Sequence, residues 1–251
     1  MGIFDIFKRG LDGNVLVSYP KSGRTWVRFA LNLASAPVTY NHGGYATRDP
    51  EGLGYRFKGV KPAFFGDRTV FLHRNPIDTA VSEFHQIHNR IFHPAHPKYA
   101  EMRQRLERLD LLPPTDLNAF VLHPVWGCEK ISAFNRAHID YFSKRKNTKI
   151  VTYEALRADP KAEFSTLLDF LGVSGYDIDH IVAESSFDRM RQIELEADAE
   201  TRKKNALYGM RDDDENSLKV RRGKVNGYFD VLTPDTVQQA RDTCARFGFS
   251  A

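Results

Sequence analysis

The chain has 251 residues, of which 41% are hydrophobic and 27% are charged. This length and composition are ordinary for a soluble globular protein with a core of its own. The formal net charge is only +4, from 36 basic and 32 acidic residues. Bulk electrostatics therefore do not favour a nucleic-acid-binding protein, although a local basic site for a small polyanion is compatible with them.

The N-terminus and the cysteines predict a cytoplasmic protein. Residues 1–10 lack the apolar run and the small-residue cleavage site of a signal peptide, and no apolar run in the chain is long enough to cross a membrane. Cys128 and Cys244 belong to no metal-binding or redox motif. Both are therefore predicted to be reduced thiols.

Strand-like and helix-like segments alternate along the chain without an internal repeat. This order predicts an α/β fold, in which a single P-loop-like domain over residues 1–251 has a central, mainly parallel sheet flanked by helices. Residues 1–13 form an N-terminal extension in this prediction, and the polar residues 197–225 form a mobile loop. The predicted strands are 14–18, 69–73 and 149–152, the predicted helices are 25–34, 78–91, 97–110, 126–144, 160–171, 177–184, 186–194 and 236–246, and residues 36–68 are predicted to be mostly loop.

The segment Tyr-Pro-Lys-Ser-Gly-Arg-Thr-Trp, residues 19–26, joins the first predicted strand to the first predicted helix. Backbone N–H groups at a helix N-terminus bind anions, and a glycine lets the chain approach the anion closely. Lys21 adds a positive charge, while Ser22 and Thr25 add hydroxyl donors. Because the lysine precedes the single glycine, this phosphate-binding loop is not the Walker A motif of ATP-binding proteins. Taken alone, the segment is also compatible with an ordinary turn that carries a lysine.

Two further segments carry arginines suited to a second phosphate. Arg74 follows the strand at 69–73, and Ser82 lies about two helical turns further on. A guanidinium fork together with a hydroxyl suits a phosphate, but an arginine at a strand end also commonly pairs with a carboxylate. The run Arg-Arg-Gly at 221–223 lies in the polar loop, where a solvated charged surface is the simpler explanation for it alone.

In combination and in order, these segments resemble the cytosolic-type sulfotransferase family, which takes a sulfuryl group from 3'-phosphoadenosine 5'-phosphosulfate (PAPS). The resemblance extends over about residues 15–233, nearly the whole chain. Its first two motifs are specific, and the others corroborate them. The similar segments are the 5'-phosphosulfate loop (19–26), the 3'-phosphate motif (74–82), the Tyr-Glu-Asp-Leu segment (151–156), the Ser-Phe-x-x-Met segment (185–190) and the Arg-Lys-Gly element (221–223).

The resemblance implies a donor site without a metal, with 3'-phosphoadenosine 5'-phosphate (PAP) as the product. Arg24 stands where the family usually has threonine, and Arg222 where it usually has lysine, so the positive charge is kept or increased. Tyr153 and Phe187 are equally compatible with a role as core aromatics. The implied residues are Lys21, Ser22, Gly23, Arg24, Thr25 and Trp26 for the 5'-phosphosulfate and one side of the adenine, Arg74, Ser82, Arg221, Arg222 and Gly223 for the 3'-phosphate, and Tyr153, Ser185 and Phe187 for the adenine pocket.

The resemblance also implies two catalytic residues. Lys21 stabilises the charge on the leaving phosphate oxygen, and a histidine ahead of the second motif accepts the proton of the acceptor. The best match is His42 in Tyr-Asn-His, although the lysine that usually precedes this histidine by two residues is absent. A neutral imidazole suits proton abstraction near neutral pH. A structural loop histidine is the alternative for His42, and the other candidate bases are His85, His88, Asp49 and Glu51.

The acceptor, a small molecule, a lipid or a glycan, is predicted to bind between residues 45–65 and 87–122. Aromatic residues there favour phenols, alcohols or lipid-like acceptors, whereas basic residues leave a polyanionic glycan open. A P-loop kinase of a small substrate and a non-catalytic nucleotide-binding protein are the competing hypotheses, and the sequence does not indicate an oligomeric state. The aromatic residues are Tyr45, Tyr55, Phe57, Phe64 and Phe92, and the basic ones are His93, His96, Lys98 and Arg103.

Overall fold

A computed structural model of the chain describes residues 13–44, 59–94, 96, 98–196, 198, 200 and 223–250. The chain divides into two compact units, Met1–Asn75 with Lys130–Ser186 and Pro76–Glu129 with Phe187–Ala251. The single domain over 1–251 therefore stays a prediction. Most of the predicted N-terminal extension and most of the predicted mobile loop lie outside the described residues.

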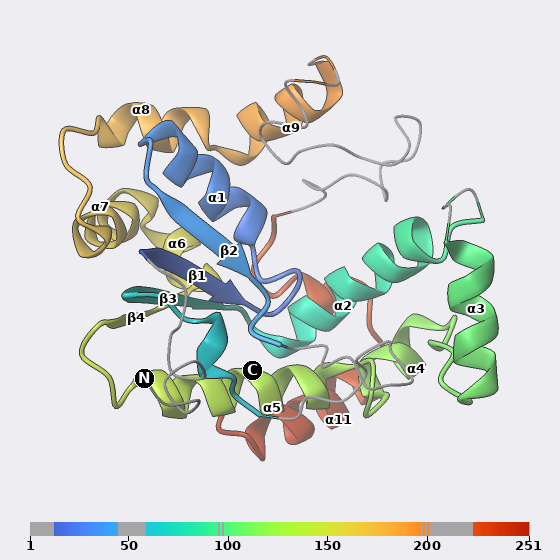
Figure 1. The fold of residues 1–251 in the computed structure, drawn as a ribbon. Coiled ribbons are helices and arrows are strands. Elements are labelled where there is room, and N and C mark those ends of the chain that lie inside the picture. The colour runs from blue at the N-terminus through green and yellow to red at the C-terminus, as the bar shows by residue number, and fades with distance from the viewer. Residues whose placement is uncertain are drawn as a thin grey trace, which may run out of the picture. The chain divides into compact units, whose positions relative to one another are not determined.

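The first unit is built around a four-stranded parallel sheet in the order β2-β1-β3-β4 (Figure 1). The central strand β1 is buried from its second residue on, which explains its continuous apolar run. The α/β fold with a parallel sheet flanked by helices is thus confirmed. The elements of this unit are β1 (Asn14–Ser18), α1 (Arg24–Leu33), β2 (Val38–Asn41), η2 (Pro62–Phe64), β3 (Arg68–His73), α5 (Cys128–Phe142, whose first two residues belong to the second unit), β4 (Thr148–Thr152), α6 (Tyr153–Ala158), α7 (Pro160–Leu171) and α8 (Ile178–Glu184).

The prediction that residues 36–68 are mostly loop was wrong for β2. Val38 to Asn41 form an edge strand that pairs with β1 in parallel, with Val17 opposite Asn41. Because no residue of β2 is fully buried, its sequence Val-Thr-Tyr-Asn lacks the apolar run that marks the other strands. The correction matters for function, since His42 follows the carboxyl end of this strand directly.

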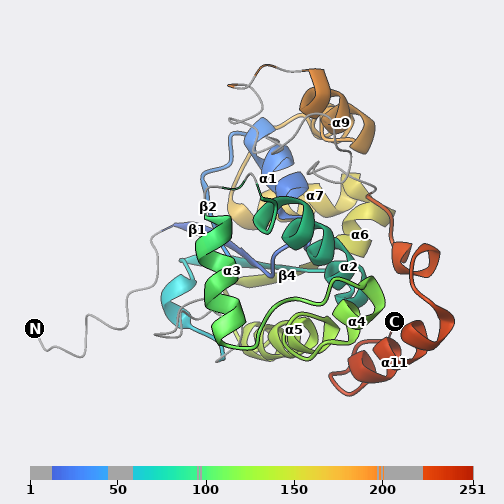
Figure 2. The same ribbon diagram turned by 90° about the vertical axis from the view of Figure 1, so that its right-hand side faces the viewer.

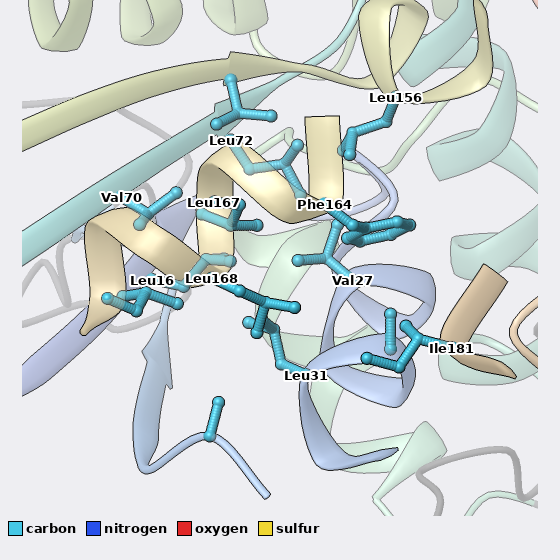
Figure 3. Close-up of a cluster of buried hydrophobic side chains, with 14 residues drawn as sticks. Leu16, Val27, Leu31, Val70, Leu72, Leu156, Phe164, Leu167, Leu168 and Ile181 are labelled. Carbon is cyan, nitrogen blue, oxygen red and sulfur yellow. The ribbon is translucent and has the colours of Figure 1, made fainter. Parts of the chain in front are cut away.

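The two faces of the sheet carry different cores. Side chains from β1, β3 and β4 pack with α1, α7 and α8 on one face (Figure 3). On the other face, Phe71 of β3 contacts Phe134, His138 and Phe142 of α5. Burial lowers the pKa of His138 to about 4, so this imidazole is neutral at physiological pH, and its Nδ1 lies 2.9 Å from the carbonyl oxygen of Phe134.

Local signals set the ends of several helices in this unit. The side chain of Asp159 caps α7, which begins at Pro160, and Gly172 ends the helix in the left-handed conformation. Asp177 caps α8 in the same way, by accepting a hydrogen bond from a backbone N–H group of the first turn. These caps explain why the boundaries of α7 agree with the sequence-based prediction.

The second unit is helical among its described residues, and α2 contacts α4, η5 and α11 (Figure 2). Cys128 and Cys244 are buried here, and neither forms a disulfide. A hydrogen bond with the Cys244 thiol, together with burial, raises the pKa of Cys128. No helix among the residues described is long and apolar enough to span a membrane. The elements are α2 (Pro76–Gln86), the π-helical turn η3 (Ile87–Ile91), α3 (Tyr99–Arg108), α4 (Leu117–Leu122), α9 (Phe187–Glu196), η5 (Gly227–Asp230) and α11 (Pro234–Ala245).

Candidate active site

The predicted phosphate-binding loop joins β1 to α1 at the carboxyl end of the sheet (Figure 1). Lys21 has a φ of 66° and Gly23 has a φ of 93°, so the chain turns twice through the left-handed region before α1 begins. Such a conformation is uncommon for a lysine and costs about 1–2 kcal/mol. Because strained residues cluster at ligand-binding loops, this geometry supports a functional role for the turn over an ordinary one.

Tyr153, at the start of α6, brings several predicted site residues together. A Cβ atom on Gly23 would lie 2.5 Å from the Tyr153 ring, so the loop backbone is in direct contact with that ring. Trp26 meets the same ring edge-on, with 5.7 Å between ring centroids. The guanidinium carbon of Arg74 lies 4.5 Å from the centre of the ring. Gly23 and Trp26 of the first motif therefore converge with Arg74 on one side chain.

Arg74 follows β3 and is held by its backbone. The carbonyl oxygen of Arg74 accepts a hydrogen bond of 3.3 Å from the side chain of Asn135. The backbone N–H of Asn75 donates a hydrogen bond of 2.9 Å to the Glu154 carboxylate. Two different segments of the first unit thus fix the turn after β3, and neither contact was predictable from the sequence.

Three buried polar groups of the predicted site suit a phosphorylated nucleoside as ligand. The hydroxyls of Ser22 and Ser185 and the indole N–H of Trp26 are buried, and none has a hydrogen-bond partner in the part of the chain that the structure describes. Ser22 and Ser185 are 0% and 1% exposed. Buried polar groups normally have partners, and an exception needs an explanation. A phosphorylated nucleoside, with phosphate oxygens and ring nitrogens as acceptors, fits these donors chemically.

His42 lies directly after β2, and both ring nitrogens have partners. Its Nδ1 is 3.0 Å from the carbonyl oxygen of Ser18, the last residue of β1. Its Nε2 is 2.7 Å from a guanidinium nitrogen of Arg24. The parallel register of β1 and β2 produces the first contact, because it aligns the carboxyl ends of the two strands. Arg24, predicted as a donor-binding residue, therefore contacts the predicted base.

The second unit carries Ser82, Phe187 and Gly223 of the predicted donor site. Ser82 lies on α2, and Phe187 begins α9. The ring of Phe187 packs against the backbone of Gly223, where an added Cβ atom would lie 2.6 Å from it. Arg221 and Arg222 lie outside the described residues. The roles of these residues toward a donor stay predictions.

Asp78 on α2 is a structural residue that the sequence reasoning missed. It is 3% exposed, and its carboxylate accepts hydrogen bonds of 2.8 Å and 3.1 Å from the backbone N–H groups of Asn226 and Tyr228. Asp78 thereby anchors the segment that follows Gly223. An aspartate in the first turn of a helix is common, so the sequence contained no signal that separates this role from an ordinary one.

The other predicted residues are divided between the two units and the undescribed segments. Asp49 and Glu51 lie outside the described residues, as do Tyr45, Tyr55 and Phe57. His88 lies in η3, where its Nε2 is 3.0 Å from the carbonyl oxygen of Pro114 and burial lowers its pKa. His85 lies in α2, Phe64 belongs to the first unit, and Phe92, His93, His96, Lys98 and Arg103 belong to the second.

The fold defines a class of protein: an α/β protein with a parallel sheet and a tight loop between its first strand and its first helix. The chain belongs to the sulfotransferase family, because the model of the sulfotransferase domain matches residues 60–247. This span begins after the loop of residues 19–26. The chain is therefore a sulfotransferase by family, while the roles of single loop residues stay predictions. The described residues contain no group of three or more His, Cys, Asp or Glu side chains arranged to hold a metal ion.

Solved structures with the same fold include sulfotransferases. The mouse sulfotransferase SULT7A1 complexed with PAP matches with a TM-score of 0.59 and 18% identity over 97% of this chain and 86% of that chain. Retinol dehydratase in complex with androsterone and inactive cofactor PAP matches with a TM-score of 0.57 and 16% identity, over 97% and 83% of the two chains. Retinol dehydratase in a complex with retinol and PAP matches with a TM-score of 0.59 and 14% identity, again over 97% and 83%. At these identities the similarity establishes a shared fold, and a comparison with curated protein sequences gives no match.

Proposed function

We propose that this sulfotransferase transfers a sulfuryl group from PAPS to a hydroxyl or amine group of a small-molecule, lipid or glycan acceptor. We further propose that the reaction takes place in the cytoplasm. One observation carries the choice of donor. The loop at the start of α1 packs on the same Tyr153 ring as Arg74, and the buried Ser22 hydroxyl in that loop has no partner among the described residues. Related folds with bound PAP support the same donor.

The proposed reaction needs positioning, charge stabilisation and one proton acceptor. The acceptor oxygen forms a bond to sulfur while the bond between sulfur and the phosphate oxygen breaks, and that oxygen keeps the electron pair. Lys21 stabilises the charge that develops on the leaving oxygen, as the N-terminus of α1 also does. Nε2 of His42 takes the proton of the acceptor group. No metal ion takes part in this proposal.

Thermal unfolding tests the donor. A ligand at a hundred times its Kd adds about 2.7 kcal/mol of stability, which raises the Tm of a chain of this size by about 5–10 °C. We expect PAP without magnesium to produce this increase and Lys21→Met to reduce it. Lys161→Met is the matched control, because Lys161 is an exposed lysine of the same unit paired with Asp179 at 2.7 Å.

Other outcomes of the same experiment distinguish the competing functions. A larger increase with ATP and magnesium than with PAP would favour a kinase and contradict the proposal. An increase with PAP, followed by no sulfuryl transfer from PAPS to any member of a phenol, alcohol, amine and glycan library, would favour a non-catalytic nucleotide-binding protein. Equal effects of Lys21→Met and Lys161→Met would remove Lys21 from the site.

A further inference from the structure

Arg24 and His42 form a hydrogen bond that fixes the protonation pattern of the imidazole. A guanidinium group only donates hydrogen bonds and a backbone carbonyl only accepts them. Nδ1 of His42 must therefore carry the proton that faces the Ser18 carbonyl at 3.0 Å, and Nε2 must accept from Arg24 at 2.7 Å. The assignment follows from the partners of the ring rather than from observed hydrogens. The result is a neutral imidazole whose only lone pair points at a positive charge.

This arrangement blocks the imidazole as a base until Arg24 moves. A neutral imidazole accepts a proton only on the nitrogen that carries the lone pair, which is Nε2 in this tautomer. An acceptor hydroxyl and the Arg24 guanidinium therefore compete for the same atom. An uncharged acceptor must break a charge-assisted hydrogen bond without replacing it. An acceptor with an anionic group gives the guanidinium a stronger partner.

The surroundings of Arg24 also favour an anion. Arg28 lies one helical turn further along α1, and its guanidinium carbon is 5.3 Å from the centre of the Tyr40 ring. Tyr40 lies on β2, two residues before His42. The Arg28 Nε and the Tyr40 hydroxyl are buried and have no hydrogen-bond partner in the described part of the chain. Two arginines of one helix thus face the edge strand that leads to His42.

We propose that Arg24 is a specificity-determining residue that selects acceptors with a carboxylate close to the reacting hydroxyl. The carboxylate forms a bidentate salt bridge with the Arg24 guanidinium and draws the guanidinium away from Nε2 of His42. The reacting hydroxyl then donates to Nε2, which takes its proton as the oxygen bonds to sulfur. The inference rests on the proposed function, and it narrows the class of acceptor for the same site. The inference also gives a reason for Arg24 to stand where the resemblance predicts threonine.

Matched acceptors test the inference by kinetics. With PAPS as donor, we expect kcat/KM for 3-hydroxybenzoate to exceed that for its methyl ester by about ten- to hundred-fold, which corresponds to about 1.4–2.8 kcal/mol. Arg24→Thr should abolish this preference in two ways: it frees Nε2, which speeds transfer to the methyl ester, and it removes the partner of the carboxylate, which slows transfer to the acid. Lys161→Met is the control, because it removes an exposed positive charge of the same unit that takes no part in the contact with His42. Loss of the preference in both variants, or its survival in Arg24→Thr, would overturn the role of Arg24.

Nuclear magnetic resonance of the histidine rings supplies a second test that does not require turnover. In protein labelled with ¹⁵N-histidine and saturated with PAP, the Nε2 signal of His42, assigned with His42→Gln, should move when 3-hydroxybenzoate is added. It should not move with the methyl ester, whereas in Arg24→Thr the acid and the methyl ester should have the same effect on it. Failure of PAP to bind would refute the proposed function. Binding of PAP with no carboxylate-dependent change at His42, or with full release of His42 by PAP alone, would refute only the inference about Arg24.

Discussion

Gly23 offers the sharpest test of the loop geometry, because replacing it with alanine has two separable effects. The φ of 93° puts any side chain in the strained left-handed region, which costs about 1–2 kcal/mol. In addition, the new Cβ atom would lie 2.5 Å from the Tyr153 ring, closer than real atoms approach. Forcing an extra methyl group into such a contact costs about 1–3 kcal/mol more. The free energy of unfolding should therefore fall by about 2–5 kcal/mol in Gly23→Ala.

Gly175→Ala separates the two effects. Gly175 lies in the same unit and has a φ of 73°, but nothing lies within 4 Å of a Cβ atom built on it. Its replacement should cost only the backbone term, about 1–2 kcal/mol. Both variants also restrict the unfolded chain equally. The difference between them, about 1–3 kcal/mol, isolates the contact with the ring.

Urea unfolding measures these free energies, and the melting shift with PAP measures the function of the loop. Gly23→Ala should lose most of the PAP-induced increase in Tm, whereas Gly175→Ala should keep it. Combining Gly23→Ala with Tyr153→Leu should recover much of the difference, because the smaller side chain gives way to the new methyl group. Equal destabilisation of the two glycine variants, or additive effects within about 0.5 kcal/mol in the double mutant, would refute the proposed contact.

Three further predictions concern an aspartate of the second unit and histidines of the first unit. Asp78→Asn leaves only one acceptor oxygen for the two backbone N–H groups that Asp78 binds, so the free energy of unfolding should fall by about 1–3 kcal/mol. The exposed control Asp188→Asn should change it by less than about 0.5 kcal/mol. Equal changes of the two variants in a urea titration would contradict the structural role of Asp78. His42→Ala should lower turnover by about 10²–10⁴-fold with an unchanged melting shift with PAP, and near wild-type turnover would exclude His42 as the base. Burial lowers the pKa of both His73 and His138 to about 4, so below pH 6.5 the unfolded chain binds protons that the folded chain does not. Stability should therefore decrease as the pH falls from 6.5 towards 4, by up to about 1.4 kcal/mol per pH unit for each histidine; His138→Gln should reduce the slope of urea-derived stability against pH by about half, and an unchanged slope would contradict the assignment.

Several features of the fold were predictable because they depend on neighbours in the sequence. The boundaries of α7 follow from the cap at Asp159, the proline at its first position and the glycine at its end. Strand β1 is recognisable because both its faces are buried. Strand β2 was missed for the opposite reason, since an edge strand that is only half buried carries no apolar signature. An apolar run in the sequence therefore indicates a strand that is buried on both faces, and it does not mark a strand that is only half buried.

The candidate site divides in a similar way. The loop at residues 19–26 was recognisable from its composition and spacing, and so was Arg74 at the end of a strand. The contact of the Tyr153 ring with this loop was not predictable, because a buried tyrosine looks the same in sequence whether it fills a core or supports a loop. The Asp78 anchor was equally hidden, since its two partners lie 148 and 150 residues away in the chain.

By itself, the sequence predicted the alternation of helices with the strands β1, β3 and β4, the tight loop between the first strand and the first helix, and the resemblance to sulfotransferases. These depend on residues within a few positions of one another, where spacing and backbone preference act directly. Only the tertiary structure decided that Arg24 meets His42 across 18 positions and that the Asn75 backbone meets Glu154 across 79. The physical reason is the parallel sheet: its register aligns the carboxyl ends of the strands, and the residues that follow those strands become neighbours whatever their distance along the chain.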